Sequence, residues 1–369
     1  MTLAGPQASV GRASRTRLPG IGPTPPGKDR LSPRTLRPGQ PQVARGASVR
    51  GPRVVPERFA LLLLVLLLPL GLNACSISKM ATKSVANSLT SGPDVFGTDE
   101  DPDLIKDALP FGLKTMESLL ATLPEHEGLL LTLCKGYTQY SYAFVQSEGD
   151  LIVNSDWTRS QALHERAYKL YLRARGFGLR GLEHRYKGIT AQLQTDPAAA
   201  AARIEARDVP MLYWTAASWG SAISLGKDRP EMLADLPAIR TLMERGLALN
   251  EGYEAGAMHE AMIILDALPP ALGGSSENAR KHFARAVELG HDSRPSPYVT
   301  LATSVVVLEQ NRAKFTELLE KALTYNPDAD PSQRLATVVL QRKARALLEH
   351  QDEFFLDDAS APDTTKTRE

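Results

Sequence analysis

The stretch VPMLYWTAASWGSAISL, residues 209–225, decides the fold class of this chain. Within it the apolar positions Leu212, Ala216, Trp219 and Ile223 follow one another at steps of four, three and four residues. That spacing places all four side chains on one side of an α-helix, because the helix turns once every 3.6 residues. The segment therefore predicts a helix.

A second set of residues lies on the other side of this expected helix. Tyr213, Ala217, Gly220 and Ser224 form a face made mostly of small side chains. Small residues allow close helix contact, so ordinary core packing is one interpretation of this face. The functional interpretation is that the face forms part of the wall of an apolar channel.

The same helical period extends outward on both sides of this segment, from Asp103 to about Phe355. Acidic residues, serines and prolines mark helix starts, and glycines or Asn-Pro mark helix ends. The starts are at 101–103, 196–197, 228–231, 275–277 and 330–331, and the ends are at 149, 226, 290 and 326–327. Short links between helices favour antiparallel neighbours. We therefore predict an all-α domain over residues 101–356, built of stacked antiparallel helical hairpins.

Degenerate internal repeats fit this domain. A tetratricopeptide hairpin has a small residue, a large apolar residue four positions later, a small one after three more, and a proline five residues on. Full or partial matches are Gly112/Met116/Leu119/Pro124, Ala167/Tyr171/Ala174, Ala279/Phe283/Ala286 and Phe315/Leu319/Ala322/Pro327. In this register Cys134 occupies a small-residue position that faces the partner helix, which predicts a buried structural thiol. A non-repeating helical bundle is the alternative, because alanine-rich helices produce partial matches by chance.

Charge divides the chain into two parts. Residues 1–74 contain 11 Lys/Arg and 2 Asp/Glu, a net charge of +9, whereas residues 75–369 contain 32 and 40, a net charge of −8. Affinity for phosphate backbones comes mostly from clustered Lys and Arg. The acidic second part therefore makes nucleic acid an improbable partner.

The basic first part resembles a targeting segment. Residues 1–58 contain ten prolines and little hydrophobic periodicity, so we expect a disordered basic leader. A leader of this length is unusual before a signal peptide, and it fits a start codon assigned too far upstream, with Val54 or Val55 as the true initiator.

An apolar run, FALLLLVLLLPLGL at residues 59–72, follows Arg58. About 14 residues fall short of the roughly 20 that a membrane-spanning helix needs. A basic residue, a short apolar run and a small-residue exit are typical of a secretory signal peptide, which we assign to residues 59–74. The exit Leu72-Asn73-Ala74-Cys75 resembles the lipobox of bacterial lipoproteins, which implies that Cys75 is acylated and becomes the first residue after cleavage. An ordinary signal peptide followed by an incidental cysteine is the alternative.

The ends of the predicted domain carry little structural signal. Residues 75–100 are polar and contain Gly92-Pro93, which predicts a flexible tether reaching on the order of 25–30 Å. Residues 357–369 are expected to form a disordered tail.

No catalytic constellation is evident. His259-Glu260 would need a second histidine at Ile263 to form a zinc-protease motif, and a nucleophile elbow, a phosphate-binding loop and a dinucleotide fingerprint are missing from the sequence. The acidic run at residues 99–103 is better explained as a helix N-terminus than as a cation site. We therefore expect no catalytic residues, no metal, no cofactor and no enzymatic activity.

Five strings, taken in order, resemble a known family. They are DALPFGLKTMESLL (107–120), GYTQYSYAFVQ (136–146), RARGFGLRGL (173–182), VPMLYWTAASWG (209–220) and GGSSENARKHF (273–283). Together they resemble TatT, the lipoprotein T component of tetratricopeptide-associated TRAP transporters, over about residues 85–356.

The resemblance implies a lipid-anchored helical scaffold that forms a homotrimer with a pore in each subunit. It also implies a partner, the periplasmic solute-binding protein of a TRAP transporter. It gives no catalytic residues and transfers only the lipidated cysteine, Cys75, which would carry palmitate or a similar acyl chain. Ser76 follows that cysteine and no retention aspartate is present, which favours the outer over the inner membrane. The alternative function is a tetratricopeptide lipoprotein of envelope assembly or secretion that binds other polypeptides.

Overall fold

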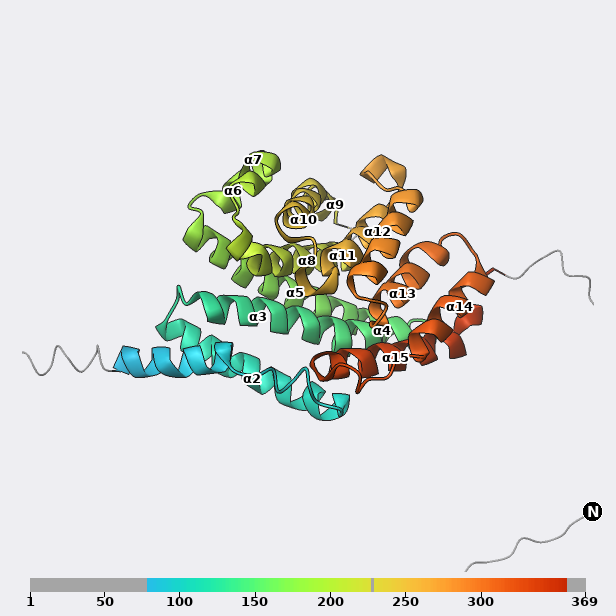
Figure 1. The fold of residues 1–369 in the computed structure, drawn as a ribbon, viewed down its shortest axis with the longest axis horizontal. Coiled ribbons are helices and arrows are strands. Elements are labelled where there is room, and N and C mark those ends of the chain that lie inside the picture. Colours follow the sequence, from blue (N-terminus) through green and yellow to red (C-terminus); the bar gives the residue numbers. More distant parts are fainter. Residues whose placement is uncertain (1–77, 227–228, 357–369) are drawn as a thin grey trace, which may run out of the picture. The chain divides into compact units, whose positions relative to one another are not determined.

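The computed structural model describes residues 78–226 and 229–356, and every regular element in these ranges is a helix (Figure 1). The prediction of an all-α fold is therefore confirmed for this part of the chain. The leader 1–58, the signal segment 59–74, Cys75 and the tail 357–369 lie outside the described residues.

The α-helices of the described residues vary in length from 4 to 29 residues. They are α2 (Pro102–Thr122), α3 (Glu127–Tyr140), α4 (Ser147–Leu151), α5 (Trp157–Arg185), α6 (Ile189–Thr195), α7 (Pro197–Ala202), α8 (Val209–Leu225), α9 (Pro230–Leu233), α10 (Leu236–Asn250), α11 (Ala257–Asp266), α12 (Ser276–Leu289), α13 (Ser296–Leu301), α14 (Arg312–Leu323) and α15 (Arg334–Glu349). Two π-helical segments, η1 (Ser141–Gln146) and η5 (Ala302–Val306), continue α3 and α13. Single 3₁₀ turns are η2 (Ala206–Asp208), η3 (Tyr253–Ala255), η4 (Pro270–Leu272), η6 (Pro331–Gln333) and η7 (Gln351–Glu353).

Most of the expected helix starts are real and are capped by the residues that predicted them. The Asp101 carboxylate accepts hydrogen bonds from the Asp103 and Leu104 amides at the start of α2. Asp196 and Ser275 accept in the same way at α7 and α12. Such side chains satisfy amide groups that have no partner within the helix.

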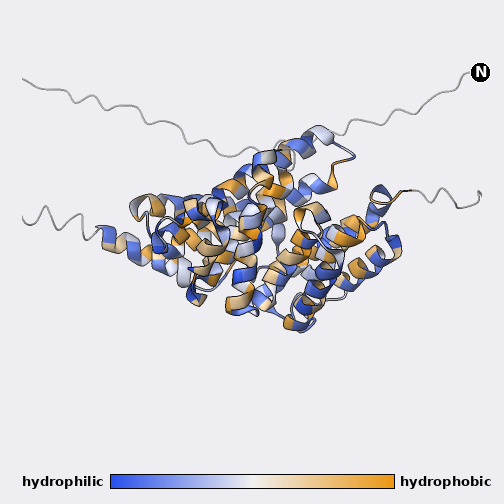
Figure 2. Cartoon of the chain, turned by 90° about the horizontal axis from the view of Figure 1, so that it is seen from above, coloured by the Kyte–Doolittle hydropathy of each residue, from blue (hydrophilic) through white to orange (hydrophobic). Residues whose placement is uncertain are grey.

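The segment 209–225 forms α8, which packs between α5, α10 and α3. Leu212, Ala216, Trp219 and Ile223 are all buried in the larger of two apolar cores. Figure 2 shows apolar and polar residues sharing most helices, as expected for helices with one face turned toward a core.

A second, smaller core lies among α11 to α15, around Phe315 and Leu319. The last helix, α15, also packs against α2 and α4 (Figure 1). Arg342 Nη1 lies 3.0 Å from Asp103 Oδ2, and the Leu335 amide donates to the Gly97 carbonyl at 3.1 Å. The end of the domain thus contacts its beginning, which the sequence did not indicate.

The expectation of a coil over residues 75–100 needs a correction, because residues 78–91 form a helix. Ala86 is completely buried, and Asn87 Oδ1 lies 2.9 Å from His126 Nε2 at the start of α3. A polar composition concealed this helix because it buries only a narrow strip and leaves most of its residues exposed.

The residues of the repeat register are mostly inside the fold. Ala167, Tyr171 and Ala174 of α5 are fully buried, as are Phe315 and other residues of the last match. Any amphipathic helix would bury such positions, so the tetratricopeptide nature of the hairpins stays a prediction.

Candidate functional site

The small-residue face of α8 is partly accessible. Ten residues of α8 are buried, whereas Tyr213, Ala217, Gly220 and Ser224 each keep an intermediate exposure. A Cβ added at Gly220 would meet no atom closer than Ile239 Cγ2 at 3.8 Å. At 1.5 Å per residue, the accessible face extends along about 16 Å of the helix. We call these four residues the α8 face.

One end of the α8 face is aromatic and acidic. The Tyr213 ring packs against the rings of Trp214 and Tyr253, with centroids 5.0 and 5.4 Å away. Burial, followed by the charges of Glu254 and Glu260, raises the pKa of Tyr213. The Tyr213 hydroxyl therefore stays neutral over the physiological range.

Glu260, beside this end, is one of the more buried carboxylates of the domain. Its side chain is 15% exposed and its Oε1 lies 3.4 Å from Arg294 Nη2, while the Ser296 hydroxyl donates to the same oxygen. Burial raises the pKa of Glu260, against the opposing effect of the Arg294 charge. The carboxylate is thus held in place by Arg294 and Ser296.

The other end of the α8 face lies near a buried tyrosine, which connects it to the π-helical segment η1. The Tyr171 hydroxyl donates to Gln146 Oε1 at 2.7 Å and lies beside Ser221 of α8. The π-helical η1 supplies Gln146 and Tyr142, and the Tyr142 ring lies 4.7 Å from Lys343 Nζ. π-Helical turns frequently occur at functional sites.

Lys343 itself is only 9% exposed, and its Nζ lies 3.7 Å from Asp150 Oδ2. Burial lowers the pKa of this ammonium, but Tyr142 and Asp150 together raise it above its ordinary value. The lysine is therefore charged and is neutralised within the protein. Sequence reasoning missed it, because nothing in α15 sets Lys343 apart from the exposed lysines of other helices.

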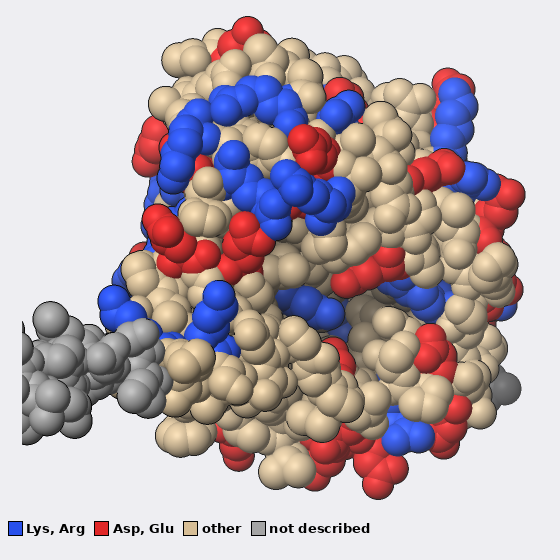
Figure 3. Space-filling view, turned by 60° about the vertical axis from the view of Figure 1, so that its left-hand side comes forward, with Lys and Arg blue, Asp and Glu red and all other residues tan. Residues whose placement is uncertain are grey.

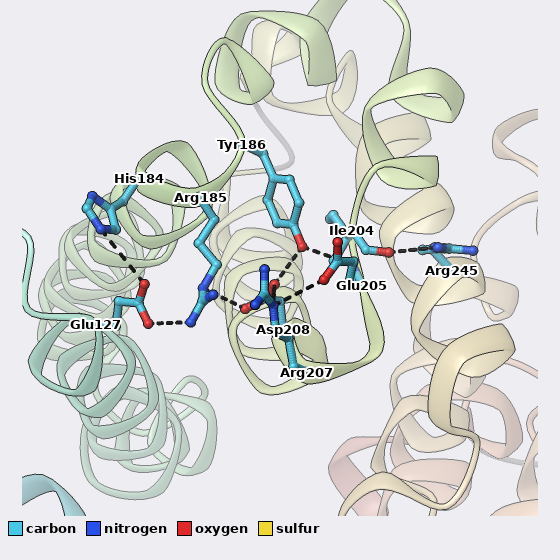
Figure 4. Close-up of polar contacts among 9 residues, drawn as sticks. All are labelled: Glu127, His184, Arg185, Tyr186, Ile204, Glu205, Arg207, Asp208 and Arg245. Carbon is cyan, nitrogen blue, oxygen red and sulfur yellow. Dashed lines mark hydrogen bonds and ion pairs between the residues drawn. The ribbon is translucent and has the colours of Figure 1, made fainter.

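A network of charged side chains joins α3, the end of α5 and η2 (Figure 4). Arg185 lies between two carboxylates, with Nη2 2.5 Å from Glu127 Oε2 and Nε 2.9 Å from Asp208 Oδ1. The Tyr186 hydroxyl donates to Asp208 Oδ2 at 2.5 Å and accepts from the Glu205 amide at 2.9 Å. Asp208 is 7% exposed, so each of its contacts replaces water that burial has removed.

This network also holds the loop before α8 from its other side. Arg245 of α10 donates to the Ile204 carbonyl from Nε and Nη2, at 3.1 and 2.7 Å. The three carboxylates of the network, on Glu127, Glu205 and Asp208, are all paired with guanidinium groups. The network is therefore best explained as a clamp that positions the start of α8. Among the side-chain nitrogen and oxygen atoms of the described residues, His184 Nδ1 alone is buried without a hydrogen-bond partner.

A pocket of about 230 Å³ lies next to this clamp. Its apolar lining includes Leu131, Leu182 and Met211, and Arg207 and Asp208 contribute charge. Figure 3 shows one face of the domain with Lys and Arg gathered in an arc over its upper part and a hollow across its middle.

Two histidines that the sequence left separate are brought together between α11 and α12. His259 Nδ1 lies 2.7 Å from His282 Nδ1, and His259 Nε2 lies 3.1 Å from Glu251 Oε1. Burial lowers the pKa of both imidazoles. One of the facing nitrogens must donate and the other accept, so the neutral pair joins the two helices.

Cys134 is buried where α3, α5 and α8 meet, as the register predicted. Its Sγ lies 4.0 Å from Ser218 Oγ, and burial raises the pKa of the thiol to about 12. A thiol in this state is a poor nucleophile.

None of the described helices has both the length and the apolar composition needed to cross a bilayer. Across residues 78–226 and 229–356, moreover, no three His, Cys, Asp or Glu side chains are arranged to hold a metal ion.

Comparison with known proteins identifies the chain. The profile of the family described as "TAtT: TRAP transporter T-component" matches residues 98–355, which span α2 to α15. A protein of Treponema pallidum (strain Nichols), described as uncharacterized, is 28% identical over 302 residues, covering 77% of this chain and 94% of that protein. Because the family match covers well over half of the sequence and almost all of the described helices, the chain belongs to the family of TRAP transporter T-components.

Proposed function

We propose that this protein is a lipoprotein of the cell envelope that binds the periplasmic solute-binding protein of a TRAP transporter. The observation that carries the proposal is the family match over residues 98–355. A T-component belongs to a transporter and not to a family of enzymes. The helical body would serve as a scaffold, with any bound solute supplied by its partner.

In this proposal Cys75 is acylated and anchors the body to the membrane, with the outer membrane favoured. Two or three acyl chains hold a protein on a bilayer almost permanently, at about 0.8 kcal/mol per buried CH₂. The expected trimer, with a pore in each subunit, belongs to the same proposal.

We also propose that the α8 face forms a wall of that pore and accepts an apolar ligand. Support comes from the partial exposure of its four residues along a helix in which ten residues are buried. Ser224 at one end of the face, and Tyr213 and Glu260 at the other, would give the passage polar ends. A ligand with an apolar body and a polar group fits such a passage.

Binding of the solute-binding protein is tested with the full chain, purified in detergent, and the solute-binding protein of a TRAP operon from the same genome. We expect a saturable complex in calorimetry. Recovery of outer-membrane assembly proteins from the envelope, with no binding of the solute-binding protein, would favour the alternative role in envelope assembly.

Anchoring is tested separately. Radiolabelled palmitate should enter the wild-type protein and fail to enter a Cys75→Ser variant. Equal labelling of both proteins would contradict the assignment of Cys75.

A further inference from the structure

Helix α5 differs in charge from the rest of the protein. Between Trp157 and Arg185 it carries seven Lys/Arg and two Asp/Glu, a net charge of +5, whereas residues 75–369 as a whole carry −8. A strongly basic helix in an acidic body creates a local field that attracts acidic groups. Solubility alone does not require such a concentration of positive charge on one helix.

Four of these cations lie along one line of the helix. Arg166, Arg173 and Arg180 are spaced by seven residues, Lys169 lies between the first two, and all four are exposed. Seven residues are nearly two turns, so successive arginines are rotated by only about 20° and are spaced by about 10 Å along the axis. We call these four residues the basic stripe.

The basic stripe faces away from the core. The buried side of α5 is formed by Ser160, Ala167, Tyr171, Ala174 and Gly178. At 100° per residue, the stripe is centred more than a third of a turn from these positions, close to the opposite side of the helix. No other described helix covers it, as the exposure of its members shows.

The arginines of the stripe are supported by aromatic rings. The Arg166 guanidinium lies 5.8 Å from the Tyr140 ring centroid, Arg173 lies 5.5 Å from that of Tyr137, and Arg180 lies 5.9 Å from that of Phe177. Stacking on a ring restricts a long side chain while leaving its N–H groups available. Binding would therefore cost less conformational entropy than it does for free arginines.

The charges of the stripe are only partly neutralised. Arg173 pairs with Glu117 at 3.7 Å and Lys169 with Glu165 at 3.3 Å. Arg166 and Arg180 have no carboxylate partner among the described residues and donate instead to the Tyr140 hydroxyl and the Pro124 carbonyl. Those two guanidinium groups retain unused donors that point out of the protein.

The side chains of the basic stripe border an open depression on the surface of α5. It has a volume of about 520 Å³ and is lined by Ala162, Glu165, Arg166, Lys169, Leu170 and Arg173, all from α5 itself. Ala162 and Leu170 give it a limited apolar contact between the cations. Such a combination fits a protein surface better than a free small anion, because a small anion would leave most of the line unused.

We propose that the basic stripe is the docking surface for an acidic helix of the solute-binding protein. This inference rests on the proposed function and names the face that would carry it out. Carboxylates seven residues apart on a partner helix would have the same spacing of about 10 Å, so they could engage successive arginines. Arginine favours such planar, two-point contacts with carboxylates.

The test compares two sets of charge reversals in the full chain. Arg166→Glu, Lys169→Glu and Arg173→Glu reverse the stripe. Lys281→Glu, Lys314→Glu and Arg342→Glu form the matched control, at side chains that are 67, 41 and 50% exposed. Circular dichroism and the thermal midpoint check folding, and Lys169→Glu alone replaces the triple variant if that variant does not fold.

We expect the reversed stripe to weaken binding of the solute-binding protein by about tenfold or more, and the control to change it less than about threefold. The affinity of the wild-type chain should fall as salt rises, and this dependence should be smaller for the reversed stripe. Arg166→Lys with Arg173→Lys keeps the charge and loses the planar groups, so it should give an intermediate affinity.

Several results overturn the inference. If the wild-type chain binds and the reversed stripe binds equally well, the docking surface lies elsewhere and the proposed function stands. If the wild-type chain does not bind at all, the proposed function fails and the inference fails with it. If the reversals change the oligomeric state, or abolish binding to phosphatidylglycerol vesicles without affecting the partner, the stripe contacts a second copy or the membrane.

Discussion

Gly178 of α5 lies where three central helices meet, and the structure predicts that this position cannot accept a methyl group. A Cβ there would lie 2.3 Å from Thr215 Oγ1 and 3.0 Å from Cys134 Sγ. Non-bonded heavy atoms prefer separations of roughly 3.5 Å. Gly178→Ala would therefore displace α5 from α8 or force Thr215 to rotate.

The cost follows from the surroundings of Thr215. It is completely buried and its hydroxyl donates to the Met211 carbonyl at 2.6 Å, so rotation would forfeit a hydrogen bond worth about 1 kcal/mol. Overpacking costs about 1–3 kcal/mol, and alanine gains about 1 kcal/mol over glycine in a helix. The net expectation is a loss of about 2 kcal/mol in the free energy of unfolding.

Gly176, two residues earlier on α5, is a matched control. A Cβ at Gly176 would meet no atom within 4 Å, so Gly176→Ala should stabilise the helix by about 0.5–1 kcal/mol. The two substitutions are chemically identical, yet they should change the free energy of unfolding in opposite directions.

Thermal unfolding followed by circular dichroism measures the difference. For a domain of this size, 2 kcal/mol corresponds to a shift in Tm of about 4–8 °C. Gly178→Ala should lower Tm by that amount, and Thr215→Ala should recover part of the loss in the double variant. An unchanged or raised Tm for Gly178→Ala would refute the close packing of α5 on α8.

Other predictions concern the thiol, an ion pair and the α8 face. Burial raises the pKa of Cys134 to about 12, so maleimide at about pH 8 should label this thiol only after the protein unfolds. Mass spectrometry of the peptide that contains Cys134 would show the labelling. Rapid labelling of the native protein would contradict the burial of Cys134. Hydrogen bonding to Arg285 lowers the pKa of Glu251 to about 2 from 4.5, so the contact stabilises the fold fully above about pH 4.5 and is lost as pH falls toward 2. Glu251→Gln should therefore flatten the dependence of Tm on pH in that window, and equal slopes would contradict this. Gly220→Phe should reduce binding of an apolar fluorescent probe. Gly220→Ala is its control and should keep both Tm and probe binding, because a Cβ at this position would meet no atom closer than Ile239 Cγ2 at 3.8 Å. Unchanged binding by Gly220→Phe would exclude the α8 face as a channel wall.

Much of the fold could be predicted because its signals are local. Asp101, Asp196 and Ser275 accept hydrogen bonds from amides two or three residues away, and the α8 pattern spans a single helix. The helix at 78–91 was missed because its composition is polar and its burial depends on Ala86, which packs in the large core against residues distant in the sequence.

The residues of the candidate site were predicted less completely. The α8 face could be named because its members recur at helical spacing. Arg185 and Asp208 are 23 positions apart, and Lys343 and Asp150 come from opposite halves of the chain. Nothing in the neighbourhood of either residue indicates its partner, and contacts of this kind depend on how the helices pack.

By itself, the sequence determined the helical class, most helix starts, the side of α8 that faces the core and the family resemblance, because helical period and capping act over a few residues. Only the tertiary structure decided that α15 contacts α2 and α4, that His259 faces His282, and that one face of α8 stays accessible. Those features depend on close packing between helices far apart in the chain, where the fit of many side chains decides which surfaces meet.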